Sequence, residues 1–152
     1  MREIFLIVST LLKSINGIKL IDKDKKQIDN YQTMPAGPFP CILIKLEIVS
    51  TETVTRFRQR CVARLTTRLA DNLVKSETST NAPFEAVERS LMYFYNADSI
   101  FNALQGYTDG YIESIDRVSS IEEDRKDDLT VVRTVFEVIF EEETSNQTDS
   151  AD

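Results

Sequence analysis

The stretch RFRQRCVARLTTRLAD, residues 56–71, decides how the rest of this chain can be arranged. Its odd positions from Phe57 to Leu69 are mostly apolar, whereas its even positions are Arg56, Arg58, Arg60, Val62, Arg64, Thr66 and Arg68. Such an alternation is typical of a strand with one buried face. A helix is the alternative, because Arg, Ala and Leu favour helices, but at helical spacing the arginines leave no continuous apolar stripe. The stretch therefore predicts a strand with one core face and one cationic face.

Three interpretations fit the cationic face, because no acid lies among its five arginines. The arginines can extend along a solvated sheet surface that their apolar stems cover. They can bind carboxylates of another subunit, for which the planar guanidinium with its fork of donors is well suited. They can also contact passing DNA. We favour an oligomer interface, whose candidate residues are Arg56, Arg58, Arg60, Arg64, Arg68, Glu137 and Glu141, the last two from the odd face of a strand predicted over residues 129–141.

Length and composition indicate one folded domain. The 152 residues suffice for one hydrophobic core, and contents of 41% hydrophobic and 28% charged residues are ordinary for globular proteins. We expect a single domain over residues 1–143 and a disordered acidic tail over residues 144–152. The net charge is −7, but residues 141–152 hold five acids and no base, so residues 1–140 carry only −2. An acidic chain does not favour general binding of DNA or RNA.

Neither membrane insertion nor export is indicated. No run approaches the ~18 apolar residues of a membrane-spanning helix. The apolar residues 4–12 follow a base, but polar residues interrupt them and no cleavage site of a signal peptide follows. Cys41 and Cys61 lie in apolar runs and form no C-x-x-C pair, which fits free thiols in a reducing, intracellular environment.

The remaining pattern predicts an α+β fold. Apolar residues at helical spacing predict helices over residues 2–15 and 84–104, the second with residues 96–99 as an alternative break. Strands are expected over residues 19–22, 41–49, 111–123 and 129–141, and the last two form a hairpin. The polar residues 72–83 predict a loop. We therefore expect a mainly antiparallel sheet of four or five strands with two helices packed on one face.

Two apolar groups carry further expectations about burial. The unbroken run over residues 41–44 indicates a strand buried on both of its faces. The aromatic residues of the second helix could form a base-stacking surface, but their helical spacing assigns them to the core. They are Tyr93, Phe94, Tyr95 and Phe101.

Several short motifs, taken in order, resemble those of a known family. Gln27-Ile28-Asp29-Asn30-Tyr31 is followed by Pro38-Phe39-Pro40-Cys41-Ile42-Leu43-Ile44, the strand with alternating arginines, an aromatic helix ending in Gly106-Tyr107, and two final strands joined by Arg125-Lys126-Asp127-Asp128. This order, over roughly residues 2–141, resembles small tail-completion proteins of phages and prophages from Bacteroides-type bacteria, which are similar to tail terminators.

The resemblance implies a structural virion protein in the tail or at the head-to-tail interface, assembled in the cytoplasm of a bacterial host. Such a protein forms a ring, a hexamer, that caps the tail tube and receives the head connector. Its expected partners are further copies of itself, the tail tube protein and a head-completion or connector protein. DNA passes through the ring without sequence-specific binding, and no membrane partner or cofactor is implied. A connector or stopper ring nearer the portal is the alternative.

Catalysis is not indicated by the side chains available. The chain has no histidine, the commonest general base and metal ligand at neutral pH, and no phosphate-binding glycine-rich loop. Two groups of acids could hold Mg²⁺ for a small metal-dependent nuclease, a distant alternative function. They are Asp22, Asp24 and Asp29, and Glu122, Glu123, Asp124, Asp127 and Asp128. Both groups lie where charged turns are expected, so we predict no enzyme, no metal site and no catalytic residue.

Overall fold

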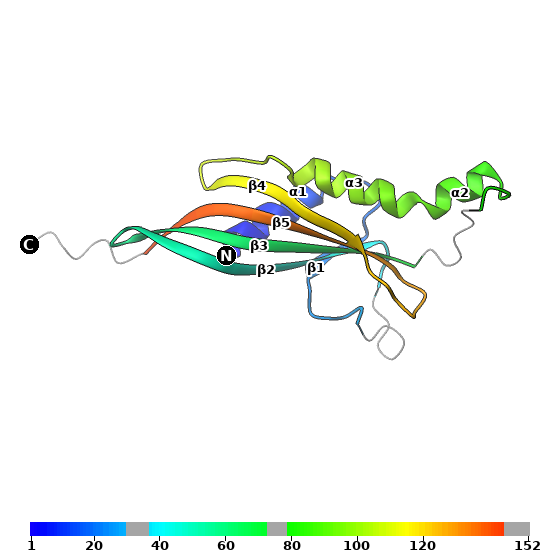
Figure 1. Ribbon diagram of the computed structural model, residues 1–152, viewed down its shortest axis with the longest axis horizontal. Coiled ribbons are helices and arrows are strands. Elements are labelled where there is room, and N and C mark those ends of the chain that lie inside the picture. The colour runs from blue at the N-terminus through cyan, green and yellow to red at the C-terminus, as the bar shows by residue number, and fades with distance from the viewer. Residues whose placement is uncertain (30–36, 73–78, 145–152) are drawn as a thin grey trace, which may run out of the picture.

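The computed structural model describes residues 1–29, 37–72 and 79–144. These residues form a five-stranded sheet in the order β1-β2-β3-β5-β4 with helices on one face, which confirms the α+β class (Figure 1). The elements are α1 (Arg2–Leu12), β1 (Leu20–Lys23), β2 (Cys41–Thr55), β3 (Arg58–Asp71), α2 (Phe84–Ser90), α3 (Met92–Leu104), β4 (Ile112–Glu122) and β5 (Thr130–Glu143). β1 pairs with β2 in parallel and the other neighbours are antiparallel, so the sheet is mainly antiparallel as expected.

The central strand β3 confirms the alternation of apolar and charged residues. It lies between β2 and β5 and is antiparallel to both. Its odd positions Cys61, Ala63, Leu65 and Leu69 are buried in the main core. The even positions therefore face the other side of the sheet, because successive side chains of a strand point to opposite faces.

The start of this strand differs from the prediction. Arg56 and Phe57 form the turn of a long β2–β3 hairpin, and β3 begins at Arg58. β2 extends beyond its expected end near Val49 and pairs with β3 as far as Thr55. Residues 49–55 are rich in β-branched side chains, which favour strands and explain this extension. Arg56 thus lies in the hairpin turn and outside the cationic face of the strand.

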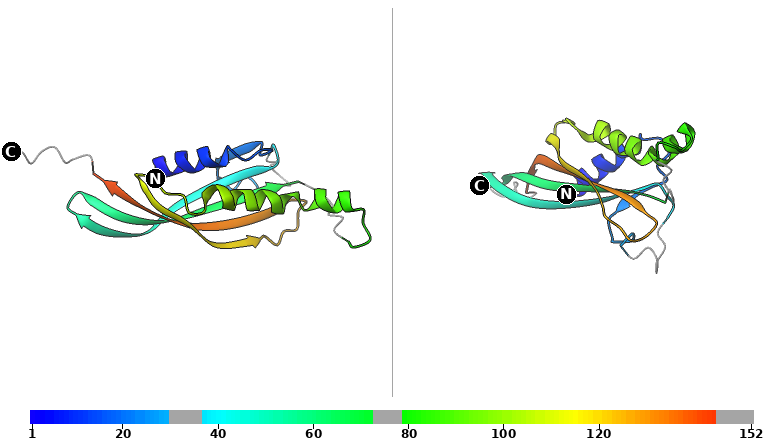
Figure 2. Two further views of the ribbon diagram at one scale, coloured as in Figure 1. Left: turned by 90° about the horizontal axis from the view of Figure 1, so that it is seen from above. Right: turned by 45° about the vertical axis from the view of Figure 1, so that its right-hand side comes forward.

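The main core lies between the sheet and the pair α1 and α3, which cover one of its faces (Figure 2). Ile4, Val8 and Leu12 follow one another at four-residue spacing, so they form one apolar side of α1. Their partners from α3 and the sheet include Ile100, Leu104, Ile115, Phe136, Val138 and Phe140. No helix among the described residues is long and apolar enough to span a membrane.

The predicted second helix is two helices, and its interruption lies at Leu91 rather than at residues 96–99. α2 has no buried residue, whereas α3 buries Asn96, Ile100 and Leu104. Consecutive residues of a helix point about 100° apart. Because Asn96, Ile100 and Leu104 face the core, the residues next to them in the sequence are turned away from it and are less buried. Assignment of all four aromatic residues to the core is therefore wrong, because Phe94 and Tyr95 are exposed.

A second, smaller apolar cluster covers only one end of the opposite sheet face. It consists of Ile28, Cys41, Leu43, Ala70, Leu129 and Val131. Ile42 and Ile44 belong to the main core instead, so the prediction that residues 41–44 are buried on both faces is confirmed. None of the helices formed by the described residues lies on the rest of this sheet face (Figures 1 and 2).

The predicted hairpin of the last two strands is confirmed as β4 and β5. The register of β4 shifts between Ile112 and Ser114 and again between Arg117 and Ser119, which explains the weak alternation of its sequence. Residues 73–78 of the predicted loop and residues 145–152 of the predicted tail lie outside the described residues.

Candidate functional site

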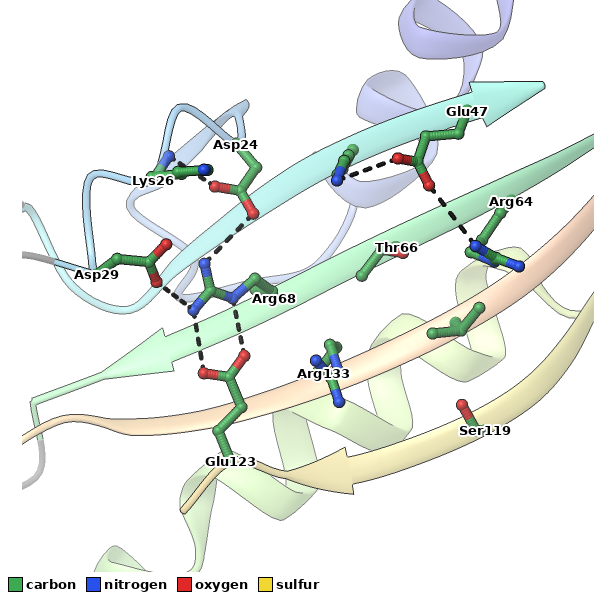
Figure 3. A pocket seen from close by; sticks show the side chains of 12 residues that line it. Asp24, Lys26, Asp29, Glu47, Arg64, Thr66, Arg68, Ser119, Glu123 and Arg133 are labelled. Carbon is green, nitrogen blue, oxygen red and sulfur yellow. Dashed lines mark hydrogen bonds and ion pairs between the residues drawn. The ribbon is translucent and has the colours of Figure 1, made fainter. Parts of the chain in front are cut away.

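The sheet face opposite α1 and α3 carries the predicted interface residues, and we call it the outer face. Cross-strand neighbours place Glu47 of β2 and Glu137 of β5 beside Arg64 of β3. At one end the surface is hollowed into an open pocket of about 490 Å³ (Figure 3). Charged residues line most of it: Asp24, Lys26, Asp29, Lys45, Glu47, Arg64, Arg68, Glu123 and Arg133.

Arg68 is the centre of the closed end of the outer face. Its Nε and Nη2 donate to the two oxygens of Glu123 at 2.9 and 3.0 Å, and Nη2 also donates to Asp29 at 2.7 Å. Nη1 donates to Asp24 at 3.4 Å. The side chain is only 11% exposed, so this guanidinium is largely removed from water and bound by three carboxylates. Figure 3 shows the three acids reaching it from both sides of β3.

A second arginine extends this cluster. Arg125 donates to Glu123, to Asp127 and to the backbone carbonyl of Ile28. Arg68 and Arg125 therefore share Glu123, and together they join the segment before β2, the strand β3 and the β4–β5 turn. We call these residues, Asp24, Asp29, Arg68, Glu123, Arg125 and Asp127, the arginine–acid cluster.

The electrostatics of the arginine–acid cluster favour the charged forms. Burial alone would lower the pKa of Arg68, but the hydrogen bonds to Glu123 and Asp29 outweigh it and raise that pKa. The bond to Asp127 raises the pKa of Arg125, and the same bond lowers the pKa of Asp127. The cluster is therefore a network of two arginines and four carboxylates whose ion pairs hold three segments together.

The same contacts bear on the nuclease alternative. Members of the two acidic groups proposed as metal ligands, Asp24 and Asp29 on one side and Glu123 on the other, do converge in the fold. They converge on the guanidinium of Arg68, and Asp22 binds Lys25. Within residues 1–29, 37–72 and 79–144, no group of three or more His, Cys, Asp and Glu side chains could hold a metal ion.

The remaining arginines of β3 also have acids of their own chain within ion-pair distance. Arg64 Nη1 lies 3.8 Å from Glu47, and Arg60 donates two hydrogen bonds to Glu113 at 2.9 and 3.2 Å. Acids of the same chain thus lie beside these arginines and beside Arg68, a pairing that the sequence of the strand itself does not show. Whether they also contact a second copy stays a prediction.

The hairpin end of the outer face is less completely paired. Arg58 Nε lies 3.4 Å from Glu141, without the geometry of a hydrogen bond, and Arg58 Nη1 lies 3.8 Å from Glu143. In the described part of the chain Glu137 forms no ion pair, and Arg56 has only the ring of Phe57, 5.2 Å from its guanidinium carbon. Exposed pairs of this kind contribute little to stability, so their charges remain open to other partners.

Alternating charges limit what the outer face can bind. Glu47, Glu137 and Glu141 lie beside the arginines, so the face presents no continuous positive surface for a phosphate backbone. A partner with its own mixture of acids and bases fits such a face better.

No family model matches this sequence, and no curated protein matches it. The fold has a counterpart. A chain in the solved structure "Virion of native gene transfer agent (GTA) particle" is similar to it with a TM-score of 0.57 and 13% sequence identity. The similarity covers 91% of this chain and 94% of the other, so nearly the whole of both chains shares one fold.

Sequence reasoning found Arg68 and assigned it to a candidate oligomer interface, with a solvated face and DNA contact as alternatives, but it missed the arginine–acid cluster. The available signal was the presence of two acid-rich turns, residues 22–29 and 122–128, in a chain whose arginine-bearing strand has no acid among its arginines. Sequence reasoning also missed the exposed apolar residues of α2 and the start of α3, because their spacing is that of a core helix.

Proposed function

We propose that this protein is a structural component of a virion, and more narrowly a tail terminator. The observation that supports it is the fold shared over nearly the full length of both chains with a chain of a gene transfer agent virion. The order of motifs in residues 2–141 resembles tail-completion proteins independently of that comparison. The two together favour assembly in a virion over a role as a free protein.

In this proposal, copies of the chain form a ring, a hexamer, that caps the tail tube and receives the head connector. The partners are the tail tube protein and a head-completion or connector protein, and DNA passes through the ring without sequence readout. The protein acts in the virion after assembly in the cytoplasm of the bacterial host. The work is mechanical, so no catalytic group is required of it.

The outer face supports this role through its exposed charges. Arg58, Arg60 and Arg64 are partly exposed and paired with acids that are themselves exposed, so a neighbouring subunit can exchange these pairs for its own. Glu137 and Glu141 offer acids on the same face. Arg68 differs, because its carboxylates are already in place, and its role is to hold the fold.

The test is the assembly state of the purified protein and its presence in virions. We expect rings by electron microscopy and a multiple of the 17.4 kDa mass by sedimentation, alone or with the tail tube protein. Mass spectrometry of purified virions should find the chain. A protein that stays monomeric with and without the tail tube protein, and is missing from virions, would contradict the proposal. Copurification with the portal-side connector instead of the tube would favour the stopper ring.

A further inference from the structure

An apolar groove lies on the outer side of α2 and the start of α3. It is an open pocket of about 430 Å³ lined by Phe84, Val87, Glu88, Leu91, Met92 and Tyr95. Phe84 is 74% exposed and Tyr95 is 68% exposed. Five of the six lining side chains are thus apolar or aromatic, and the one charge is an acid.

The helix that forms this groove has little support from the described residues of its own chain. α2 has seven residues, none of them buried. An isolated helix of this length is not stable in water, because the gain per residue does not offset the cost of the first turn. Burial of large apolar side chains such as Phe84 would supply the missing stabilisation. The groove is therefore a surface that a partner completes.

The opposite end of the molecule carries a second incomplete surface. Residues 49–60 form the projecting part of the β2–β3 hairpin, which we call the hairpin arm. Val49 and Val54 of this arm are exposed, and so are the residues between them. Figure 1 shows the hairpin turn at one end of the long axis and α2 at the other.

The two surfaces are complementary in charge as well as in their apolar character. Arg56 lies in the turn of the hairpin arm and, among the described residues, has no acid within ion-pair distance. Glu85 and Glu88 lie on α2, likewise without an ion pair in the described part of the chain. Within the described ranges, the arm thus carries an arginine without an acid partner beside exposed apolar residues, and the groove carries an acid without a basic partner, at opposite ends of the long axis (Figure 1).

We propose that the hairpin arm of one copy docks into the α2–α3 groove of the next copy. Val54 is covered by the apolar wall of the groove, and Arg56 faces Glu88. Because the two surfaces differ, the contact is head-to-tail, and such contacts close into a ring when the rotation between copies allows. This inference rests on the proposed ring and assigns the surfaces that join its subunits.

Charge reversal tests the proposed contact. Arg56→Glu and Glu88→Arg should each weaken self-association at least about tenfold, because each places like charges together at the contact. The double variant should recover most of the association, since the pair is restored in reversed order. Sedimentation velocity measures the association, with the tail tube protein present if the ring requires it. Lys13→Glu, an exposed charge reversal just after the C-terminal end of α1, is the matched control and should associate like the unchanged protein.

Mixing two blocked variants tests the head-to-tail geometry. Val54→Asp blocks the arm and Met92→Asp blocks the groove, and both positions are exposed, so circular dichroism should show an unchanged fold. Each variant alone should be monomeric. A mixture should give dimers and no rings, because only one intact arm and one intact groove remain.

The outcomes separate this inference from the proposed function. Rings that persist in the reversed and blocked variants would overturn the arm-to-groove contact and leave the ring intact. Association of Val54→Asp at the strength of the unchanged protein would also overturn it. A protein that is monomeric under all conditions would overturn both proposals.

Discussion

Two positions of β3, one near its covered end and one at its middle, present the same residue type in opposite circumstances. At the covered end, Arg68 is 11% exposed and binds three carboxylates, whereas Arg64, four residues earlier on the same side of the strand, is 55% exposed and lies 3.8 Å from one. The covering segments make the difference: the residues before β2 and the β4–β5 turn enclose Arg68 and leave Arg64 in solvent. Position in the strand sets the face of an arginine, but the layer above that face sets its role.

The largest effect is expected from removing the buried arginine. Arg68→Ala leaves Asp24, Asp29 and Glu123 close together without the cation that neutralises them. Breaking a buried ion pair on one side costs about 3–5 kcal/mol, so the free energy of unfolding in urea should fall by that order. A loss under about 1 kcal/mol would show that the arginine–acid cluster does not hold the fold.

A smaller effect is expected from the second half of the cluster. Asp127→Asn keeps the shape of the side chain but removes the charge that binds Arg125, a bond worth about 1.5–3 kcal/mol. The folded-state pKa of Asp127 lies below its ordinary 3.8, so this stability is complete above pH 3.8 and is lost as the pH falls through the lowered folded-state pKa. Urea unfolding at several pH values should show the two proteins converging in acid. A difference in the free energy of unfolding that stays constant with pH would contradict a stabilising role of the Asp127 charge.

Arg64→Ala is the matched control for Arg68→Ala, because it removes the same side chain from the same face of the same strand. Its exposed pair with Glu47 should contribute about 0–1 kcal/mol, and less at high salt. If this variant destabilises the fold as much as Arg68→Ala, the contrast between the enclosed and the solvated arginine does not hold. Its effect on ring formation is a separate measurement, which tests the predicted interface.

The smallest expected effect concerns the two thiols. It is a difference in the rate at which they react with thiol reagents, with no change in the stability of the fold. Burial raises the pKa of Cys41 to about 11 and also raises that of Cys61, so both should react slowly with thiol reagents near neutral pH. Cys61 lies next to the hairpin arm and Cys41 lies under the covered end. We expect Cys61 to react first, through local opening of the arm. Labelling followed by mass spectrometry measures which thiol reacts first. The variants Cys41→Ala and Cys61→Ala assign each labelled species to its cysteine. Faster reaction at Cys41 would reverse the comparison.

Much of the fold was predictable because it depends on local periodicity. The alternation in residues 56–71 predicted β3, the apolar run 41–44 predicted a strand buried on both faces, and the last two strands were predicted as a hairpin. The errors fall where tertiary contacts decide. Phe94 and Tyr95 follow the spacing of core residues, yet Asn96, Ile100 and Leu104 take the core side of α3.

The candidate site was predictable only in part for the same reason. The sequence identified the arginines but not their partners, since Asp24 and Glu123 are far from Arg68 along the chain. Acids of the same chain lie beside Arg60, Arg64 and Arg68, and no local pattern predicts this, because it depends on which turn folds over which strand.

By itself the sequence determined the type of most elements and the apolar side of regular strands such as β3, because these follow from the period of side chains along a backbone. Only the tertiary structure decided that Arg68 is enclosed while Arg64 is solvated, and that α2 and the hairpin arm stand uncovered at opposite ends. Those outcomes depend on where distant segments pack. Burial and ion pairing depend on a residue's neighbours in space. The sequence around that residue does not show which distant segments these neighbours come from.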